Sequence, residues 1–145
     1  MPLKNFGSIL TFAAELESAD HDFYGAAASN PSLAEHKKML EELAAEKKKN
    51  EKLMLRLCRE SVCEMILEPI VGFTKEPFLS DRGGTETMSW KQLLEKAEDL
   101  ETKAVEFYTK AAEKIRALPE VSRALARTAT RRATDKQRLE QLPWE

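Results

Sequence analysis

An apolar stripe with alternating spacings of three and four residues runs through the second quarter of the chain. Its clearest members are Leu40, Leu43, Met54 and Leu57. This spacing keeps side chains on one face of an α-helix and is typical of a helix buried along that face. The same stripe passes through Lys47 and Asn50, where a buried face should be apolar. The stripe therefore predicts a long helix of a bundle with two polar side chains at the centre of its buried face.

The composition favours one all-α domain. The chain has 145 residues, of which 42% are hydrophobic and 33% are charged, with only five glycines and six prolines. This length suits a single domain with a full core, and the few helix breakers leave long stretches uninterrupted. The net charge of −2 argues against a general nucleic-acid binder and against a protein that docks on anionic membranes.

No apolar run reaches the about 18 residues that a membrane-spanning helix needs. The N-terminal segment turns polar and acidic too early for a signal peptide, so we expect a cytoplasmic protein. Cys58 and Cys63 lie five residues apart, with no second cysteine pair or histidine cluster to complete a zinc site. We expect both to be buried or half-buried thiols, with a redox pair as the alternative.

Four helical segments are expected within the single domain, at about residues 8–29, 31–60, 89–117 and 119–142. Two short connections flank a long one at residues 61–88, which is rich in proline and glycine. This order predicts a ferritin-like antiparallel four-helix bundle, in which two helical hairpins are joined by a long crossover connection.

Signals for the start of a helix support two of these boundaries. Asn30 and Pro31 have the form of a cap followed by a first-turn proline, and Ser32 with Glu35 offers an alternative capping box. Ser89 has the position of the cap for the third helix.

The two halves of the chain repeat one another. The segment "ELESADHDFYGAAA", from Glu15, matches "DLETKAVEFYTKAA", from Asp99, at both polar and apolar positions. The period of 84 residues makes Glu17 equivalent to Glu101 and predicts that the two hairpins arose by duplication.

Both repeated segments resemble the first and third helices of rubrerythrin-related, ferritin-like di-iron proteins. The resemblance covers nearly all of the chain outside the central connection. It implies that Glu17 and Glu101, each six residues before a Phe-Tyr pair, correspond to iron ligands. It also implies a Glu-x-x-His motif on the second and on the fourth helix, because residues three apart share a helix face. Oxygen and nitrogen donors of this kind suit iron or manganese.

The chain departs from that pattern at both Glu-x-x-His positions. In "LAAEKKKN" Lys47 stands at the glutamate position and Asn50 at the histidine position. On the fourth helix Arg132 and Asp135 have the spacing of the second motif, and of these two only Asp135 offers a metal-binding atom. The two cations would face any bound divalent ion in a low-dielectric interior, where like-charge repulsion is large.

We therefore expect a degenerate di-iron site in which side-chain cations replace the metals. The expected members of this salt-bridge network are Glu17, Asp20, Lys47, Asn50, Glu101, Arg132 and Asp135. Three acids, Glu17, Glu101 and Asp135, would oppose two cations, so about one proton or one water-filled approach would have to account for the difference. In a competing interpretation, Lys47 extends past its neighbours to solvent.

These features predict a non-catalytic bundle without a cofactor that acts as a structural or protein-interaction module. We expect a homodimer, with an unidentified protein as a further partner and no nucleic-acid or membrane partner. The alternative is an iron-binding oxidoreductase or peroxide-handling protein, in which the metal ligands are Glu17, Glu101, Asp135 and His21.

Three ring side chains close to the predicted site have simpler interpretations. His21 lies one turn after Glu17 and is otherwise expected to be a hydrogen-bonded imidazole at the edge of the core. Tyr24 and Tyr108 are expected to pack in the core, with their hydroxyl groups within reach of the central charges.

Overall fold

The chain forms an all-helical bundle. The computed structural model describes residues 3, 5–61, 70 and 72–143, and these residues contain four α-helices and no β-strand. The helices are α1 (Phe6–Ala28), α2 (Lys37–Ser61), α3 (Trp90–Lys114) and α4 (Pro119–Glu140). The prediction of an all-α fold with four helices is confirmed. No helix of the described part is both long enough and apolar enough to cross a bilayer.

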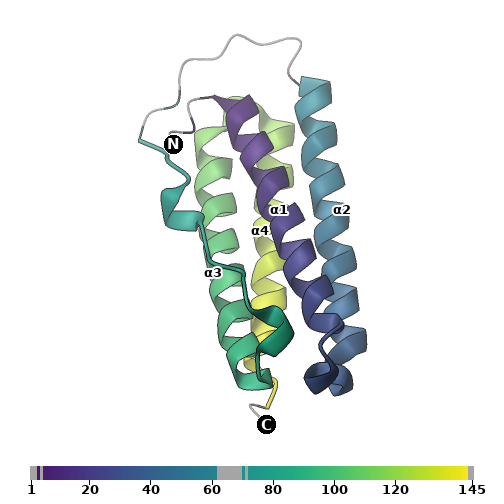
Figure 1. Ribbon diagram of the computed structural model, residues 1–145. Helices are drawn as coiled ribbons and strands as arrows, with labels where there is room; N and C mark the ends of the chain where they lie inside the picture. Colours follow the sequence, from purple (N-terminus) through teal and green to yellow (C-terminus); the bar gives the residue numbers. More distant parts are fainter. Residues whose placement is uncertain (1–2, 4, 62–69, 71, 144–145) are drawn as a thin grey trace.

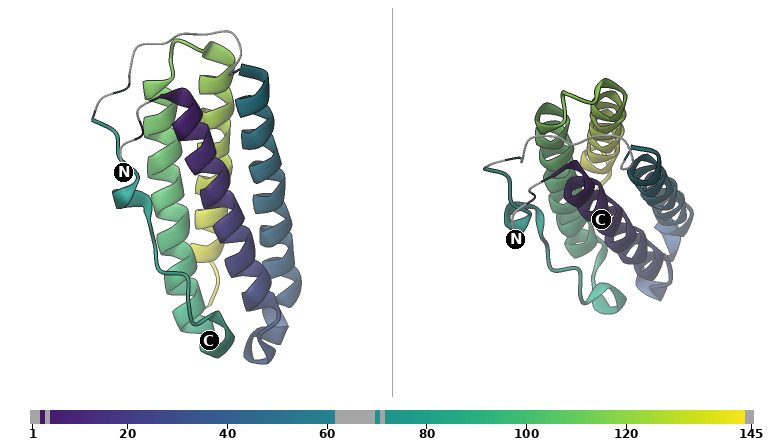
Figure 2. Two further views of the ribbon diagram at one scale, coloured as in Figure 1. Left: turned by 45° about the horizontal axis from the view of Figure 1, so that its top comes forward. Right: turned by 90° about the horizontal axis from the view of Figure 1, so that it is seen from above.

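The helices form two antiparallel pairs, α1 with α2 and α3 with α4 (Figure 1). Seen along the bundle, α1 also lies next to α3, and α2 lies next to α4 (Figure 2). α2 and α3 begin at the same end of the bundle and run in the same direction. The residues between these two helices therefore span the length of the bundle before α3 begins.

The described part of this connection, residues 72–89, runs along α3 in the opposite direction (Figure 1). Phe73 and Phe78 first pack against the ring of Phe107 on α3. Further along, the Lys103 ammonium donates to the carbonyl oxygen of Leu79 at 2.9 Å. The segment contains two short 3₁₀ turns, η2 (Glu76–Phe78) and η3 (Thr85–Thr87). It is therefore packed against the bundle through side-chain and backbone contacts.

The start of the second helix differs from the prediction. Residues 31–36 form a 3₁₀ segment, η1 (Pro31–His36), and α2 begins only at Lys37. Leu33 has φ −111° and ψ 18°, which interrupts the helical geometry. Asn30 acts as the cap by accepting a hydrogen bond from the Ser32 amide, with Pro31 in the first turn as expected. The cap predicted at Ser89 is confirmed at the start of α3, where Ser89 and Gln92 form a capping box.

The core consists of two apolar clusters separated along the bundle axis. One cluster lies at the end where α1 begins and includes Ile9, Phe107 and Leu125. The other lies at the end where α3 begins and includes Leu40 and Leu93. Between them lies a layer of buried polar and charged side chains, which is described below. Of the two cysteines, Cys58 is a partly buried free thiol beside the first cluster, and residue 63 lies outside the described residues.

Asn30 joins the first hairpin to the connection, and its loss is expected to destabilise the fold. Its side-chain Nδ2 donates to the carbonyl oxygens of Thr85 (2.9 Å) and Met88 (3.1 Å), and the residue is buried. Asn30→Ala should lower the free energy of unfolding by about 1–3 kcal/mol, because it leaves the buried Thr85 carbonyl and the partly buried Met88 carbonyl without this donor. Urea denaturation would measure the change.

Asn30→Asp separates the two roles of this residue. The aspartate keeps the acceptor for the Ser32 amide but loses both donors, so it should cost nearly as much as Asn30→Ala. Ser29→Ala, at an exposed neighbouring position, is the control and should stay within about 0.5 kcal/mol of wild type. Equal stability of all three variants would contradict this role.

Candidate functional site

The charged layer in the middle of the bundle receives side chains from all four helices. Its members from the predicted set are Glu17 and Asp20 on α1, Lys47 and Asn50 on α2, Glu101 on α3, and Arg132 and Asp135 on α4. All seven are buried, and Asp135 is the most exposed at 7%. Each of these positions belongs to the apolar stripe of its helix or lies beside it, so helix packing turns these side chains toward the bundle axis.

Arg132 is the centre of this layer. Its guanidinium donates from Nη1 to Glu17 Oε1 at 3.2 Å and from Nη2 to Asp20 Oδ2. Its Nε lies 2.9 Å from Glu101 Oε1, in an ion pair whose geometry is too bent for a hydrogen bond. Burial alone would lower the pKa of Arg132, but the three carboxylates raise it well above the ordinary value. The guanidinium is therefore a permanent charge that joins α4 to α1 and α3.

Lys47 is the second buried cation. Its Nζ lies 2.7 Å from Asp135 Oδ2 and 3.2 Å from Glu101 Oε2. The side chain is 0% exposed, so the competing interpretation in which Lys47 reaches solvent is wrong. Burial and the nearby Arg132 charge oppose its ionisation, but the surrounding carboxylates raise the pKa of Lys47. Lys47 thus remains an ammonium group that joins α2 to α3 and α4.

The two tyrosines of the repeat bond to the glutamates of the opposite repeat. The Tyr108 hydroxyl donates to Glu17 Oε2 and the Tyr24 hydroxyl donates to Glu101 Oε2, each at 2.6 Å. Both tyrosines are fully buried, as expected. Burial and the neighbouring glutamate raise the pKa of each phenol well above its ordinary value, so both remain neutral hydrogen-bond donors.

Glu17 receives three donors. Besides Tyr108 and Arg132, the Asn50 Nδ2 donates to Glu17 Oε1 at 3.2 Å. Burial still raises the pKa of Glu17, although the charges of Arg132 and Lys47 oppose this shift. Asn50 stands where the resemblance implies a metal-binding histidine. Its amide thus donates a hydrogen bond to a carboxylate.

The layer also contains two charged residues that were not among the members predicted from the sequence. Arg82, on the connection, pairs through Nε with Asp20 Oδ1 at 2.8 Å and donates from Nη1 to the Ser80 carbonyl oxygen at 3.1 Å. Glu46 lies 3.5 Å from the Lys47 ammonium. Arg82 stands in a segment without periodicity, so no local pattern signals its contact. Glu46 directly precedes Lys47 in the sequence, but it lies on a partly exposed face of α2 and therefore outside the buried stripe.

Glu46 and Asp135 act as a hydrogen-bonded carboxyl pair at the edge of the layer. Burial, followed by the hydrogen bond with Asp135, raises the pKa of Glu46 from 4.5 to about 7. Burial opposes ionisation of Asp135 as well, but the hydrogen bond from Glu46 and the Lys47 charge lower the pKa of Asp135. Below about pH 7 Glu46 is therefore mostly protonated, and this proton is lost as the pH rises through that value.

The charge balance differs from the expected three acids and two cations. The layer contains five carboxyl groups: Glu17, Asp20, Glu46, Glu101 and Asp135. It contains three cations: Lys47, Arg82 and Arg132. The acids thus outnumber the cations by two, and a proton on Glu46 below about pH 7 reduces this difference. The excess is small because the connection supplies a third cation.

The residues of this layer do not fit a di-iron centre. Within the described part of the chain, no group of three or more His, Cys, Asp or Glu side chains has an arrangement that could hold a metal ion. The carboxylates of Glu17, Glu101 and Asp135 are held by buried cations and tyrosine hydroxyls. His21 is directed elsewhere, with its Nδ1 2.8 Å from the Ala44 carbonyl oxygen.

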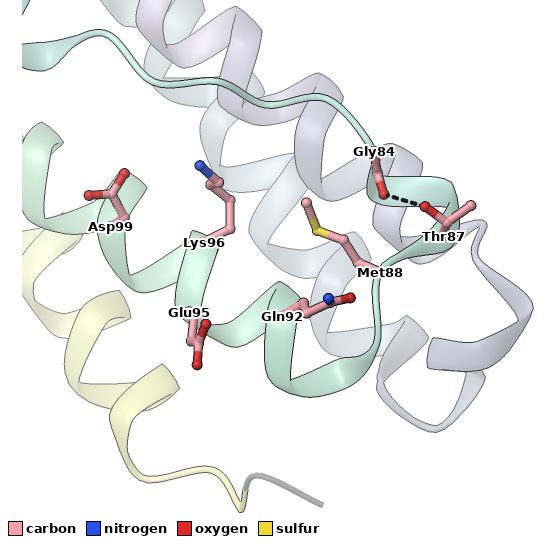
Figure 3. A pocket seen from close by; sticks show the side chains of 7 residues that line it. All are labelled: Gly84, Thr87, Met88, Gln92, Glu95, Lys96 and Asp99. Atoms are coloured by element: carbon pink, nitrogen blue, oxygen red, sulfur yellow. Dashed lines mark hydrogen bonds between the residues drawn. The ribbon is translucent and has the colours of Figure 1, made fainter.

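A surface pocket of about 480 Å³ lies between the connection and the first half of α3 (Figure 3). Gly84, Thr87 and Met88 line it from the connection, and Glu95, Lys96 and Asp99 are among the α3 residues that face it. Gly84 has φ +83°, a left-handed conformation that glycine adopts without strain. None of the residues that line this pocket belongs to the charged layer.

Comparisons of the chain with models of protein families, with curated proteins and with solved structures give no match.

Removing the buried ammonium should strongly destabilise the protein. Lys47→Met leaves Asp135 and Glu101 without their shared cation, and stranding buried charges costs about 3–5 kcal/mol. Lys48→Met is the matched control, because the Lys48 side chain is 49% exposed and should contribute at most about 0.5 kcal/mol. Urea denaturation at pH 7 measures both variants. A loss below about 1 kcal/mol for Lys47→Met would contradict the pairing.

Glu46 should make stability depend on pH. Its folded pKa of about 7 exceeds its ordinary 4.5, so the folded state holds a proton that the unfolded state has released between these values. The contribution of Glu46 to stability is therefore present below pH 4.5 and is lost as the pH rises to about 7. Glu46→Gln keeps a donor for Asp135 and cannot ionise. It should gain roughly 1–3 kcal/mol relative to wild type between pH 5 and pH 8.

The control for this experiment is Glu41→Gln, an exposed glutamate on the same helix. Its stability relative to wild type should not change with pH over the same range. If Glu46→Gln followed the wild-type pH profile, the shared proton would have to lie elsewhere in the layer.

Proposed function

We propose that this protein is a non-catalytic, ferritin-like bundle related to the rubrerythrin group that has lost its di-iron centre and works as a structural or protein-interaction module. One observation carries the proposal. Arg132 contacts both Glu17 and Glu101, the two residues to which the resemblance assigns iron. A guanidinium thus has the position that a bound metal would need.

The electrostatics of the layer support this substitution. Lys47 and Arg132 are permanent cations at the two positions where the resemblance implies metal-binding glutamates. In a protein interior, a divalent ion placed near them would meet strong like-charge repulsion. The same two cations neutralise the carboxylates that would otherwise be unpaired, so the layer is stable without a metal.

The reciprocal contacts of the repeat support an origin by duplication. Tyr24 donates a hydrogen bond to Glu101, and Tyr108 donates one to Glu17. Each half of the chain thus supplies the tyrosine that binds the glutamate of the other half. The parallel direction of α2 and α3, with a connection that spans the bundle, is what a ferritin-like crossover requires. These features favour the ferritin-like topology among four-helix bundles.

Burial of the layer favours a structural role over catalysis. The seven predicted members are at most 7% exposed, and their carboxylates are held by ion pairs and hydrogen bonds. Catalysis requires that a substrate reach the reacting groups within hydrogen-bond distance. A closed and paired layer serves stability, whereas the outer helix faces are accessible to other molecules.

Iron binding tests this proposal directly. The purified protein should contain no stoichiometric iron, either as isolated or after anaerobic titration with ferrous ions followed by gel filtration. Elemental analysis gives the metal content. Stoichiometric iron that Glu17→Ala abolishes would overturn the proposal and favour the iron-binding oxidoreductase, with Glu17, Glu101, Asp135 and His21 as candidate ligands.

Restoring the two motifs should restore metal binding. The variant with Lys47→Glu, Asn50→His, Arg132→Glu and Asp135→His places Glu-x-x-His on α2 and α4. It should gain up to two ferrous ions per chain, because it supplies four carboxylates and two imidazoles and removes both cations. Lys48→Glu with Glu51→His, on an outer face of α2, is the control and should gain none. Circular dichroism confirms that each variant keeps its helices.

A further inference from the structure

The outer side of α2 carries a row of four exposed cations. They are Lys49, Lys52, Arg56 and Arg59. Their spacings of three, four and three residues place them on one face of the helix. Together with Leu53 and Leu55 they line a surface depression of about 410 Å³, which no acidic side chain of the described residues borders. The row therefore presents positive charge over about three turns of α2.

A second row of positive charge lies on α4. Arg127 and Arg131 are exposed, and they precede Arg138 by 11 and seven residues, so the three share one face of the helix. Arg138 donates to Glu42 Oε1 on α2 at 3.0 Å. This face of α4 is therefore turned toward α2, which lies beside it in the bundle (Figure 2).

The two rows lie at the same height along the bundle. α2 and α4 are antiparallel (Figure 1), and the contact of Lys47 with Asp135 at 2.7 Å fixes their register. Arg131 and Arg127 lie about one and two turns from this contact, level with residues 49–56 of α2. The two rows together are called the basic face, which consists of Lys49, Lys52, Arg56, Arg59, Arg127 and Arg131.

Most charges of the basic face are not neutralised by the chain itself. Arg56 pairs with Glu60 at 3.8 Å, and the pair of Arg138 with Glu42 lies beyond the other end of the face. The other cations of the face form no ion pair with any residue of the described chain. Because the net charge of the whole protein is −2, positive charge is concentrated here, and it attracts an acidic partner.

An apolar side chain lies between the two rows. Leu53 follows Glu42 by 11 residues and so shares the side of α2 that faces α4. It is half-buried and lines the same depression as the cations of α2. Leu55, which is 42% exposed, also lines this depression. A ligand complementary to the basic face therefore carries apolar groups between anionic ones.

An acidic amphipathic helix matches these features better than a nucleic acid does. Glutamates three or four residues apart on a helix repeat with the same spacing as the cations of α2. Apolar residues between the glutamates would meet Leu53, whereas a phosphate backbone has no apolar group to place there. No aromatic residue of the described chain lines the depression, so bases have no ring on which to stack.

We propose that the basic face binds an acidic amphipathic helix of a partner protein. The carboxylates of that helix pair with the cations of α2 on one side and with Arg127 and Arg131 on the other. Its apolar side chains pack on Leu53 between the two rows. This inference rests on the proposed function as a protein-interaction module and names the chemistry of the partner.

Binding of a designed peptide tests the proposal. The probe is a fluorescein-labelled peptide of about 18 residues, long enough to form a helix, with leucines three and four residues apart and glutamates on both sides of them. Fluorescence anisotropy should show binding that weakens as salt is added, because exposed ion pairs are screened. In NMR spectra of the protein, the backbone amide signals that shift should belong to residues 49–59 and 123–131.

Charge reversal on the basic face should remove most of this binding. Lys52→Glu combined with Arg127→Glu reverses one cation in each row and should raise the dissociation constant by at least about tenfold. Lys37→Glu combined with Lys38→Glu is the matched control, because it makes the same change in net charge at exposed positions of α2. These positions lie about three turns before Lys49, farther away than the screening length, so the control should bind like wild type. Circular dichroism confirms that both variants are folded.

Four outcomes would overturn the proposal. The first is a wild-type protein that does not bind the peptide, or binds it with signal shifts outside the two segments. The second is equal binding of a peptide with the same composition in scrambled order, which would reduce the contact to charge alone. The third is tighter binding of a short DNA duplex that the double reversal abolishes. The fourth is self-association that the double reversal abolishes, which would make a second copy the occupant.

Iron content separates this inference from the proposed function. A protein that holds stoichiometric iron and also binds the peptide would contradict the loss of the di-iron centre but leave the basic face as a binding surface. An iron-free protein that does not bind the peptide would contradict this inference alone.

Discussion

The contact of one buried guanidinium with three carboxylates is the interaction on which the rest of this structure depends. Arg132 comes from α4, whereas its partners Glu17 and Asp20 come from α1 and Glu101 comes from α3. A charge in a protein interior is tolerated only when paired and hydrogen-bonded, so these helices must keep the relative positions that bring the charged groups together. The register of the two hairpins follows from this requirement.

The charged layer divides the core into two apolar clusters and connects the long crossing segment to the interior. Uniform apolar faces would allow helices to slide by a turn, whereas a misplaced layer would leave several charges unpaired. Arg82 fixes the position of the connection in the same way, because its ion pair with Asp20 holds this segment against the bundle. The layer costs desolvation energy, and in return it favours one arrangement of the four helices.

The interior and the exterior of this bundle have separate roles. Inside, permanent cations neutralise carboxylates and tyrosine hydroxyls complete the hydrogen bonds, while burial raises the pKa of the partly exposed Glu46 to about 7. Outside, exposed charges of both signs lie around Leu55 on one helix face. Because the charged layer is closed, the surfaces that other molecules can reach are outer ones, such as the face around Leu55 and the pocket beside α3.

The sequence by itself determined the four helices, the cap at Ser89 and the presence of Lys47 and Arg132 on buried faces. These properties follow from the spacing of residues a few positions apart, which repeats with the helical turn. Only the tertiary structure decided that Arg82 enters the layer, that burial raises the pKa of Glu46, and that residues 31–36 form a 3₁₀ segment. These properties depend on contacts between distant segments, such as Arg82 with Asp20 and Asn30 with Met88, and no local pattern records which distant groups will meet.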